Sequence, residues 1–91
     1  MNYIRAKWMH SQLHEPVVLL SELDQDRWEI RKVEIYADGR LDYADHQRSS
    51  SHTRLSSEPI PSLAEIGADK QFEPSEISAA EFEAAWNRAI A

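Results

Sequence analysis

The sequence WEIRKVEIYADGRLDY, at residues 28–43, is the part of the chain that decides the fold. Charged and apolar residues alternate on both sides of Asp38-Gly39, a pair typical of the turn in a β-hairpin. Glycine reaches positive φ without steric cost and aspartate tolerates the left-handed region, so we expect a type I′ turn there. The stretch predicts two antiparallel strands, over residues 27–36 and 40–44.

The first of these strands changes phase along its length. Trp28 and Ile30 have even numbers, whereas Val33 and Ile35 have odd ones, so one flat face cannot hold all four. We therefore expect a β-bulge near Arg31-Lys32. The alternative is a strand that needs apolar groups on both faces because it lies between other layers.

Two more strands precede this hairpin. Residues 3–10 alternate, with Ile4, Ala6 and Trp8 on one side, which predicts a half-buried strand. Residues 17–20 form an unbroken apolar run followed by Leu23, which is typical of a central strand buried on both faces. Short turns between successive strands indicate an antiparallel meander.

The segment after the hairpin carries fewer signals. Residues 45–53 contain no apolar residue, so we expect a mobile surface loop that cannot pack. Pro59-Ile60-Pro61 predicts an extended stretch, and residues 62–65 match a capping box that opens a helix of one or two turns before Gly67. Residues 70–75 are expected to be a connector.

The last element has the clearest pattern. Ser78 is the expected N-cap with Glu81 three residues later, and Ile77 with Phe82 would form a hydrophobic staple. One apolar stripe at helical spacing follows, made of Phe82, Ala85, Trp86, Ala89 and Ile90. We expect an α+β fold in one domain, residues 1–91, in which about four antiparallel strands are packed by this C-terminal helix, with the short helix before it.

Composition narrows the classes of function. The 91 residues include 10 Lys and Arg against 16 Asp and Glu, a net charge of −6, which argues against binding to nucleic acids or anionic membranes. The absence of cysteine excludes disulfides, thiolate zinc sites and cysteine nucleophiles. No apolar run is long enough to span a bilayer and no signal peptide is evident, so we expect a cytoplasmic protein.

One pattern is specific enough to suggest a family. It begins at Ser21 and reads SELDxDRxExRKVEIYxDGR, with Trp8 and His10 before it and Pro59-Ile60-Pro61 after it. Together with the acidic stretch at residues 73–78, it resembles a family of short bacterial proteins catalogued only as a domain of unknown function. The resemblance covers almost the whole chain and implies a bacterial source, but it supplies no catalytic residue.

Histidine and serine raise two chemical alternatives. His10 and His14 are four apart, a spacing that converges on a helix but not at a strand end, and His46 and His52 flank Ser49-Ser50-Ser51 in the predicted loop. Scattered surface histidines are the favoured interpretation. A serine hydrolase is disfavoured because the loop has no glycine elbow, so we predict no metal, cofactor or catalytic residue.

Aromatic and charged residues have both structural and binding interpretations. Trp8, Trp28 and Trp86 are expected to meet in the core beneath the helix, the alternative being an exposed anchor patch. The charges of residues 27–34, with Arg5 and Lys7, would form cross-strand pairs on a solvated face or else a recognition surface. The acidic side chains of residues 73–83 would stabilise the positive N-terminal end of the helix dipole, or else form a docking surface for a basic partner.

The leading hypothesis for function is a non-catalytic protein-binding module, more specifically an immunity or antitoxin-like protein that blocks a basic toxin. Two glycines in all and no cofactor fingerprint argue against an enzyme. The alternatives are a homodimer built on a strand edge or exposed tryptophan, and a metal protein or enzyme that uses His10, His14 or residues 45–53. The candidate partner-binding residues are Trp8, His10, Arg27, Arg31, Glu73 and Glu76.

Overall fold

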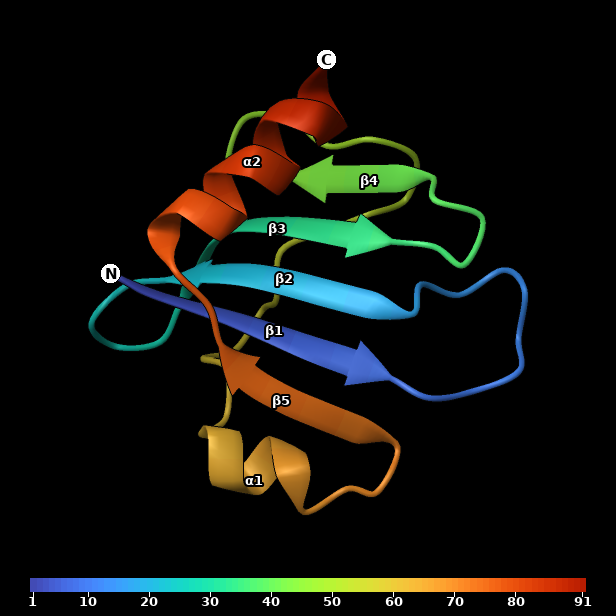
Figure 1. The fold of residues 1–91 in the computed structure, drawn as a ribbon. Helices are drawn as coiled ribbons and strands as arrows, with labels where there is room; N and C mark the ends of the chain where they lie inside the picture. Colours follow the sequence, from blue (N-terminus) through green and yellow to red (C-terminus); the bar gives the residue numbers. More distant parts are fainter.

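Five strands and two helices follow one another along residues 1–91, all of which the computed structural model describes (Figure 1). In chain order they are β1 (Asn2–Trp8), β2 (Val18–Leu23), β3 (Glu29–Ile35), β4 (Leu41–Ala44), α1 (Leu63–Gly67), β5 (Phe72–Glu76) and α2 (Ala79–Ile90). The strands form one antiparallel sheet in the order β4-β3-β2-β1-β5. The predicted α+β class with a C-terminal helix is confirmed, and the sheet has one strand more than expected.

The additional strand is β5, in the segment predicted to be a connector. It pairs with β1, from Ile4 opposite Glu76 to Trp8 opposite Phe72, at one edge of the sheet. Pro74 obscured this strand because proline cannot donate a ladder hydrogen bond, although it is tolerated at an edge. The ladder bonds on either side of β5, from Ile77 N–H to Tyr3 and from Met9 N–H to Gln71, place Pro74 at an outward-facing position.

The central strand is β2, as predicted, and its burial continues from Leu20 to Leu23 on both faces. The predicted bulge in β3 is also confirmed, one residue from its expected place. Glu22 pairs with Arg31 whereas Leu23 pairs with Glu29, so Ile30 is the extra residue. Because of this shift, Glu29 lies on the sheet face opposite to Arg31 and Val33, where it accepts from the Ser21 hydroxyl.

The turn between β3 and β4 differs from the prediction. Gly39 has φ 88° and donates its N–H to the Tyr36 carbonyl at 2.9 Å, but Asp38 does not have positive φ. A type I′ turn requires positive φ at both central residues. The loop is instead the three-residue type, in which only the glycine adopts the left-handed conformation.

One sheet face, called the helix face here, carries α2 (Figure 1). The predicted capping box of α2 is present, because Ser78 accepts from the Glu81 N–H and the Glu81 carboxylate accepts from the Ser78 N–H. The predicted stripe faces the sheet, with Phe82, Ala85 and Trp86 buried. The core cluster beneath α2 consists of Leu20, Val33, Phe82, Ala85 and Trp86.

The opposite face, called the loop face, is crossed by the chain between β4 and α1, which runs behind the sheet in Figure 1. The prediction that residues 45–53 cannot pack is wrong. Thr53 is only 5% exposed and its hydroxyl donates to Glu34 at 2.9 Å, while the Ser50 hydroxyl donates to Asp42 at 2.9 Å. Polar residues pack here because the sheet surface beneath them carries carboxylates.

The three tryptophans do not meet, so their predicted shared core is wrong. Trp86 belongs to α2 and is buried, Trp8 is half-buried at the end of β1, and Trp28 is 45% exposed just before β3.

Neither helix has the length or the apolar character needed to cross a bilayer.

Candidate functional site

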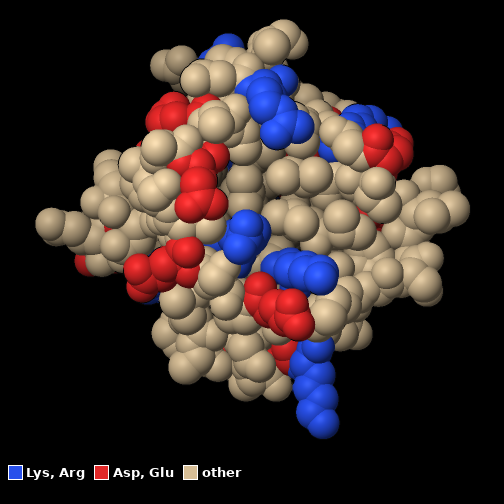
Figure 2. Space-filling view, viewed as in Figure 1, with Lys and Arg blue, Asp and Glu red and all other residues tan.

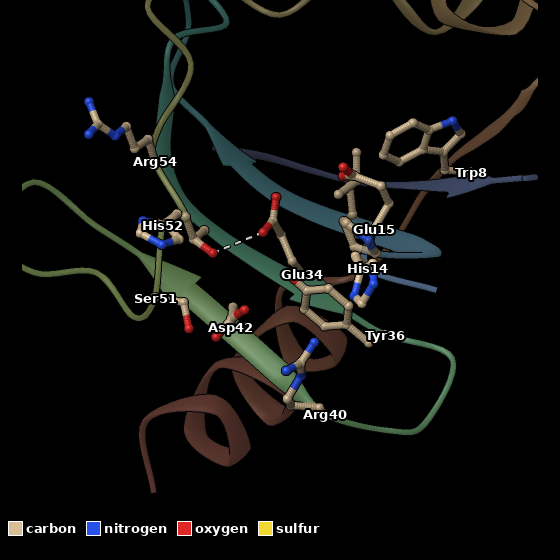
Figure 3. Close-up of a pocket in the computed structure, with 13 residues that line it drawn as sticks. Trp8, His14, Glu15, Glu34, Tyr36, Arg40, Asp42, Ser51, His52 and Arg54 are labelled. Atoms are coloured by element: carbon tan, nitrogen blue, oxygen red, sulfur yellow. Dashed lines mark hydrogen bonds between the residues drawn. The ribbon is translucent and has the colours of Figure 1, made fainter. Parts of the chain in front are cut away.

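A groove on the loop face is lined by acidic, basic, aromatic and hydroxyl side chains (Figure 3). This polar groove has a volume of about 540 Å³. Its floor comes from β2, β3 and β4, and its walls come from the β1–β2 loop and from residues 51–54. The lining residues are Trp8, His14, Glu15, Pro16, Leu19, Glu34, Tyr36, Arg40, Asp42, Ser51, His52, Thr53 and Arg54.

Two carboxylates lie side by side on the floor of the polar groove. Glu34 on β3 and Asp42 on β4 are directly opposite one another in the strand register. Like charges at such positions destabilise a sheet unless something offsets them. Here the hydroxyls of Thr53 and Ser50 each donate to one of the two carboxylates, at 2.9 Å.

Neither of these carboxylates has a cation beside it. The four ion pairs of the protein use Glu22, Glu83, Glu29 and Asp45 instead. Arg54 points away from the floor in Figure 3, and the Arg40 guanidinium lies over the Tyr36 ring at 4.3 Å. The groove therefore carries two partly shielded negative charges that form no ion pair, although Arg40 and Arg54 are among its lining residues.

Tyr36 forms one side of this floor and stays protonated near neutral pH. Burial first, and then the neighbouring Asp42 carboxylate, raise the pKa of Tyr36 to about 12. A phenol in this state can donate a hydrogen bond but cannot act as a base. Its ring is already covered on one face by Arg40.

The histidines do not assemble a metal site. No group of three or more His, Asp or Glu side chains is placed to hold an ion. His14 and His52 both line the polar groove, but neither makes a hydrogen bond to a carboxylate. His10 instead bonds the Pro16 carbonyl at 2.8 Å and accepts from the Gln12 N–H at 3.0 Å, which fixes the β1–β2 loop.

The serine run has a structural part in this arrangement. The Ser50 hydroxyl bonds both Asp42 and the Tyr43 N–H, and Ser51 has φ 51° at the edge of the groove. A hydrolytic triad needs a serine bonded to a histidine that is itself bonded to an acid. That chain of hydrogen bonds is not formed.

The six residues predicted to bind a partner are distributed over separate parts of the molecule. Trp8 lines the polar groove, where its ring stacks on Phe72 at 5.7 Å and meets His10 edge-on at 4.5 Å, measured between ring centroids. Arg27, at φ 67°, donates from its side chain to the carbonyls of Ile60 and Pro61 at 2.9 and 2.7 Å. These bonds connect residues 60–61, on the loop face, to the turn that precedes β3.

Arg31 lies under α2 on the helix face. It binds Glu22 at 2.6 Å and also pairs with Glu83, and its guanidinium lies about 5 Å from the rings of Phe82 and Trp86. The partners of Arg31 thus lie on β2 and α2, whereas the expected pairing of the β3 charges with Arg5 and Lys7 is not formed. Arg31 itself is partly buried and does not lie on a solvated face.

Glu73 and Glu76 lie on β5, at the opposite edge of the sheet from β4. Glu73 is opposite Lys7, and Glu76 is opposite Ile4. On the helix face, which Figure 2 shows, acidic and basic side chains alternate and neither sign forms a block. Of the six, only Trp8 reaches the polar groove.

Sequence reasoning missed the groove because it assigned the charges of β3 to one solvated surface. A signal was present: Glu34 and Tyr36 are two apart and therefore share a face, and the Asp38-Gly39 turn brings Asp42 opposite Glu34. The position of residues 50–53 beside the groove was not predictable, because it depends on two hydroxyl-to-carboxylate bonds, Ser50 to Asp42 and Thr53 to Glu34. No sequence pattern pairs these residues.

These features define a class: a small antiparallel α+β domain with a polar groove on the sheet face opposite α2. No curated protein and no solved structure matches the chain. The chain belongs to the family described as Domain of unknown function (DUF6881), whose model matches residues 2–91. The resemblance drawn from the Ser21–Arg40 pattern is thereby confirmed.

Proposed function

We propose that this domain is a non-catalytic protein-binding module that accepts a basic side chain of its partner in the polar groove. The observation that carries the proposal is the pair Glu34 and Asp42, which are opposite each other in the groove and form no ion pair. A lysine or arginine inserted there would relieve the repulsion between the two carboxylates.

The walls of the groove suit such a side chain. Glu15 adds a third carboxylate at the rim, and Trp8 offers an aromatic ring, a residue type enriched where interfaces are strongest. Arg40 and Arg54 limit the negative charge, so the groove favours one cationic side chain over a polybasic segment. This is more specific than attraction by the net charge of −6 alone.

The acids near the start of α2 support a basic partner less well. Glu81 is engaged in the capping box, Glu83 pairs with Arg31, and Glu73 lies opposite Lys7. Each of these carboxylates thus has a partner or a cation near it. We therefore place the docking surface on the loop face.

A homodimer formed through strand edges is less favoured, because both edges are occupied. At β4, Ala44 bridges to Ser49 and the Tyr43 carbonyl accepts from the Ser50 N–H at 2.9 Å. At β5, Pro74 removes an outward N–H, and α1 packs against its ring near Gly67. A partner would meet a face of the molecule and not an edge.

Within this class, we propose an immunity or antitoxin-like role, in which the groove captures a basic residue that a toxin needs for its own activity. The support is the small size, the acidic balance and the groove itself. Co-expression with a toxin encoded beside it should restore growth, and the variant with Glu15→Gln and Glu34→Gln should lose this protection.

Binding to a lysine-containing peptide tests the groove directly. We expect amide NMR signals of Glu34 and Asp42 to shift with a serine peptide that carries a single central lysine, and not with the same peptide carrying glutamate in its place. Glu34→Gln keeps an acceptor for Thr53, so the double variant E15Q/E34Q should stay folded while affinity falls by roughly fivefold to tenfold.

Glu58→Gln is the matched control, since Glu58 is exposed and lies outside the groove. It removes one negative charge and should change the affinity less than twofold, an estimate from the small effect of a distant screened charge. A free-energy loss in E58Q about half that in E15Q/E34Q, in proportion to the one and two charges removed, would mean that net charge, and not the groove, attracts the peptide.

A further inference from the structure

A second cavity on the loop face has a different chemistry from the polar groove. This apolar cavity has a volume of about 360 Å³ and lies between the sheet, residues 60–61 and α1. Half of its twelve lining residues are hydrophobic. The lining comprises Ile4, Ala6, Leu19, Ser21, Glu29, Lys32, Ile60, Pro61, Glu65, Ile66, Asp69 and Phe72.

The polar groups on the floor of this cavity are already satisfied within the protein. Glu29, only 4% exposed, accepts from the Ser21 hydroxyl at 2.6 Å and from the Ser56 N–H at 2.8 Å. Lys32 donates to the Arg54 carbonyl at 2.9 Å and lies 3.5 Å from Glu29. The floor therefore presents no unpaired charge to a ligand.

The roof of the cavity is held open by Arg27. Its side chain binds the carbonyls of Ile60 and Pro61, and its own carbonyl accepts from the Ile60 N–H at 2.8 Å. These three bonds hold residues 60–61 in place at the edge of the cavity. The space is preformed and of the size that small ligands occupy, about 300–1,000 Å³.

The rim of the cavity carries negative charge. Glu65 and Asp69 are four residues apart at α1, both are exposed, and neither forms an ion pair. Glu65 also bonds the Ser62 N–H at 3.1 Å, and Asp69 the Gln71 N–H at 2.9 Å, so each carboxylate is held in place with one oxygen free. Because both carboxylates line the same cavity, its rim favours a cation.

We propose that the apolar cavity binds a small amine with an apolar body, whose ammonium group lies between Glu65 and Asp69. The body would contact Ile4, Ile60, Ile66 and Phe72, and the floor would contribute no charge. The site adjoins the polar groove at Leu19 but shares no charged residue with it, and the proposal does not depend on the function assigned to that groove.

Three indole compounds of similar shape and different charge test this proposal. We expect the cation tryptamine to shift the amide signals of Ala6, Ile60, Ile66 and Phe72 in a saturable manner. Neutral indole should bind about fivefold more weakly and the anion indole-3-acetate more weakly still, since two exposed ion pairs contribute modestly.

Two variants separate the roles of the cavity and of its rim. Ala6→Leu adds a side chain into the open space above β1 and should abolish binding of all three compounds. The double variant E65Q/D69N keeps both hydrogen-bond acceptors, and it should lower the affinity for tryptamine about fivefold, to that of indole.

Ala84→Leu is the control for Ala6→Leu, because it makes the same change at an exposed position of α2 on the other side of the sheet. It should leave all three affinities unchanged. The proposal is overturned if no compound gives saturable shifts, if the shifts persist in Ala6→Leu, or if indole-3-acetate binds as well as tryptamine. E15Q/E34Q should not affect tryptamine, which distinguishes the outcome from that of the polar groove.

Discussion

Arg31 connects strand β2 to helix α2 on the helix face. It pairs with Glu22 on β2 and with Glu83 on α2, and it lies over two aromatic rings of α2. The Glu22 side chain is only 8% exposed, so its charge depends on Arg31 and on the hydroxyl of Tyr3, which donates at 2.8 Å. One arginine thus connects the sheet to the helix and also neutralises a buried carboxylate.

Replacing Arg31 should destabilise the protein strongly. We expect Arg31→Met to lower the free energy of unfolding by about 3 kcal/mol, because it leaves Glu22 buried without its cation. Urea denaturation of the two proteins measures the difference. Arg88→Met is the control, since Arg88 is exposed and forms no ion pair, and it should change stability by less than about 0.5 kcal/mol. Equal effects of the two variants would contradict this account of Arg31.

The same residue predicts how stability depends on pH. The Arg31 guanidinium holds the pKa of Glu22 below its usual value of 4.5. A carboxyl whose pKa is lower in the folded state stabilises the fold above its unfolded pKa, and this stabilisation is lost as pH falls through the folded pKa. Urea midpoints should therefore fall between about pH 5 and pH 2 more steeply in the natural protein than in Arg31→Met. Parallel pH profiles would be inconsistent with a pairing of this kind.

At the scale of elements, the two helices begin with the same capping box but bury different amounts of surface. Ser62 and Ser78 both accept from the N–H three residues later. In α2 the residues that follow supply most of the core, whereas α1 has no buried residue. The same local motif therefore supports elements of unequal importance.

This difference gives a matched pair of variants. Ser78→Ala should lower the free energy of unfolding by about 1 kcal/mol, because α2 unfolds only with the core. Ser62→Ala removes an equivalent cap but should change global stability much less, and its effect should appear as faster amide exchange in α1 alone. If the two variants shift the urea midpoint equally, α1 is part of the cooperative core.

The elements also show where sequence patterns succeed. The stripe of α2, the bulge in β3 and the central place of β2 were predictable, because each depends on burial by a face with a fixed period. The strand β5 and the packing of residues 45–53 were not, because β5 pairs with the distant β1 and the packing depends on single hydroxyl-to-carboxylate bonds. Pro74 suppresses the local strand signal of β5. Thr53 is buried where its hydroxyl bonds Glu34 on β3, a contact that no local sequence pattern predicts.

At the scale of the whole molecule, the closed edges of the sheet make a prediction about assembly. Ser49 and Ser50 cover β4, and Pro74 with α1 covers β5. We expect light scattering at micromolar concentration to give the mass of one chain. A mass of two chains that is lost on changing an exposed residue of β5 would show that the edge pairs after all.

The sheet order has a further consequence for biosynthesis. The N-terminal strand β1 lies between β2 and β5, and three of the five core residues belong to α2. A ribosome therefore completes the β1–β4 meander well before the residues that finish the core leave its exit tunnel. Until Ile90 emerges, Leu20 and Val33 have nothing to cover them, so the nascent chain reaches its cooperative fold only after residues 72–90 have been synthesised.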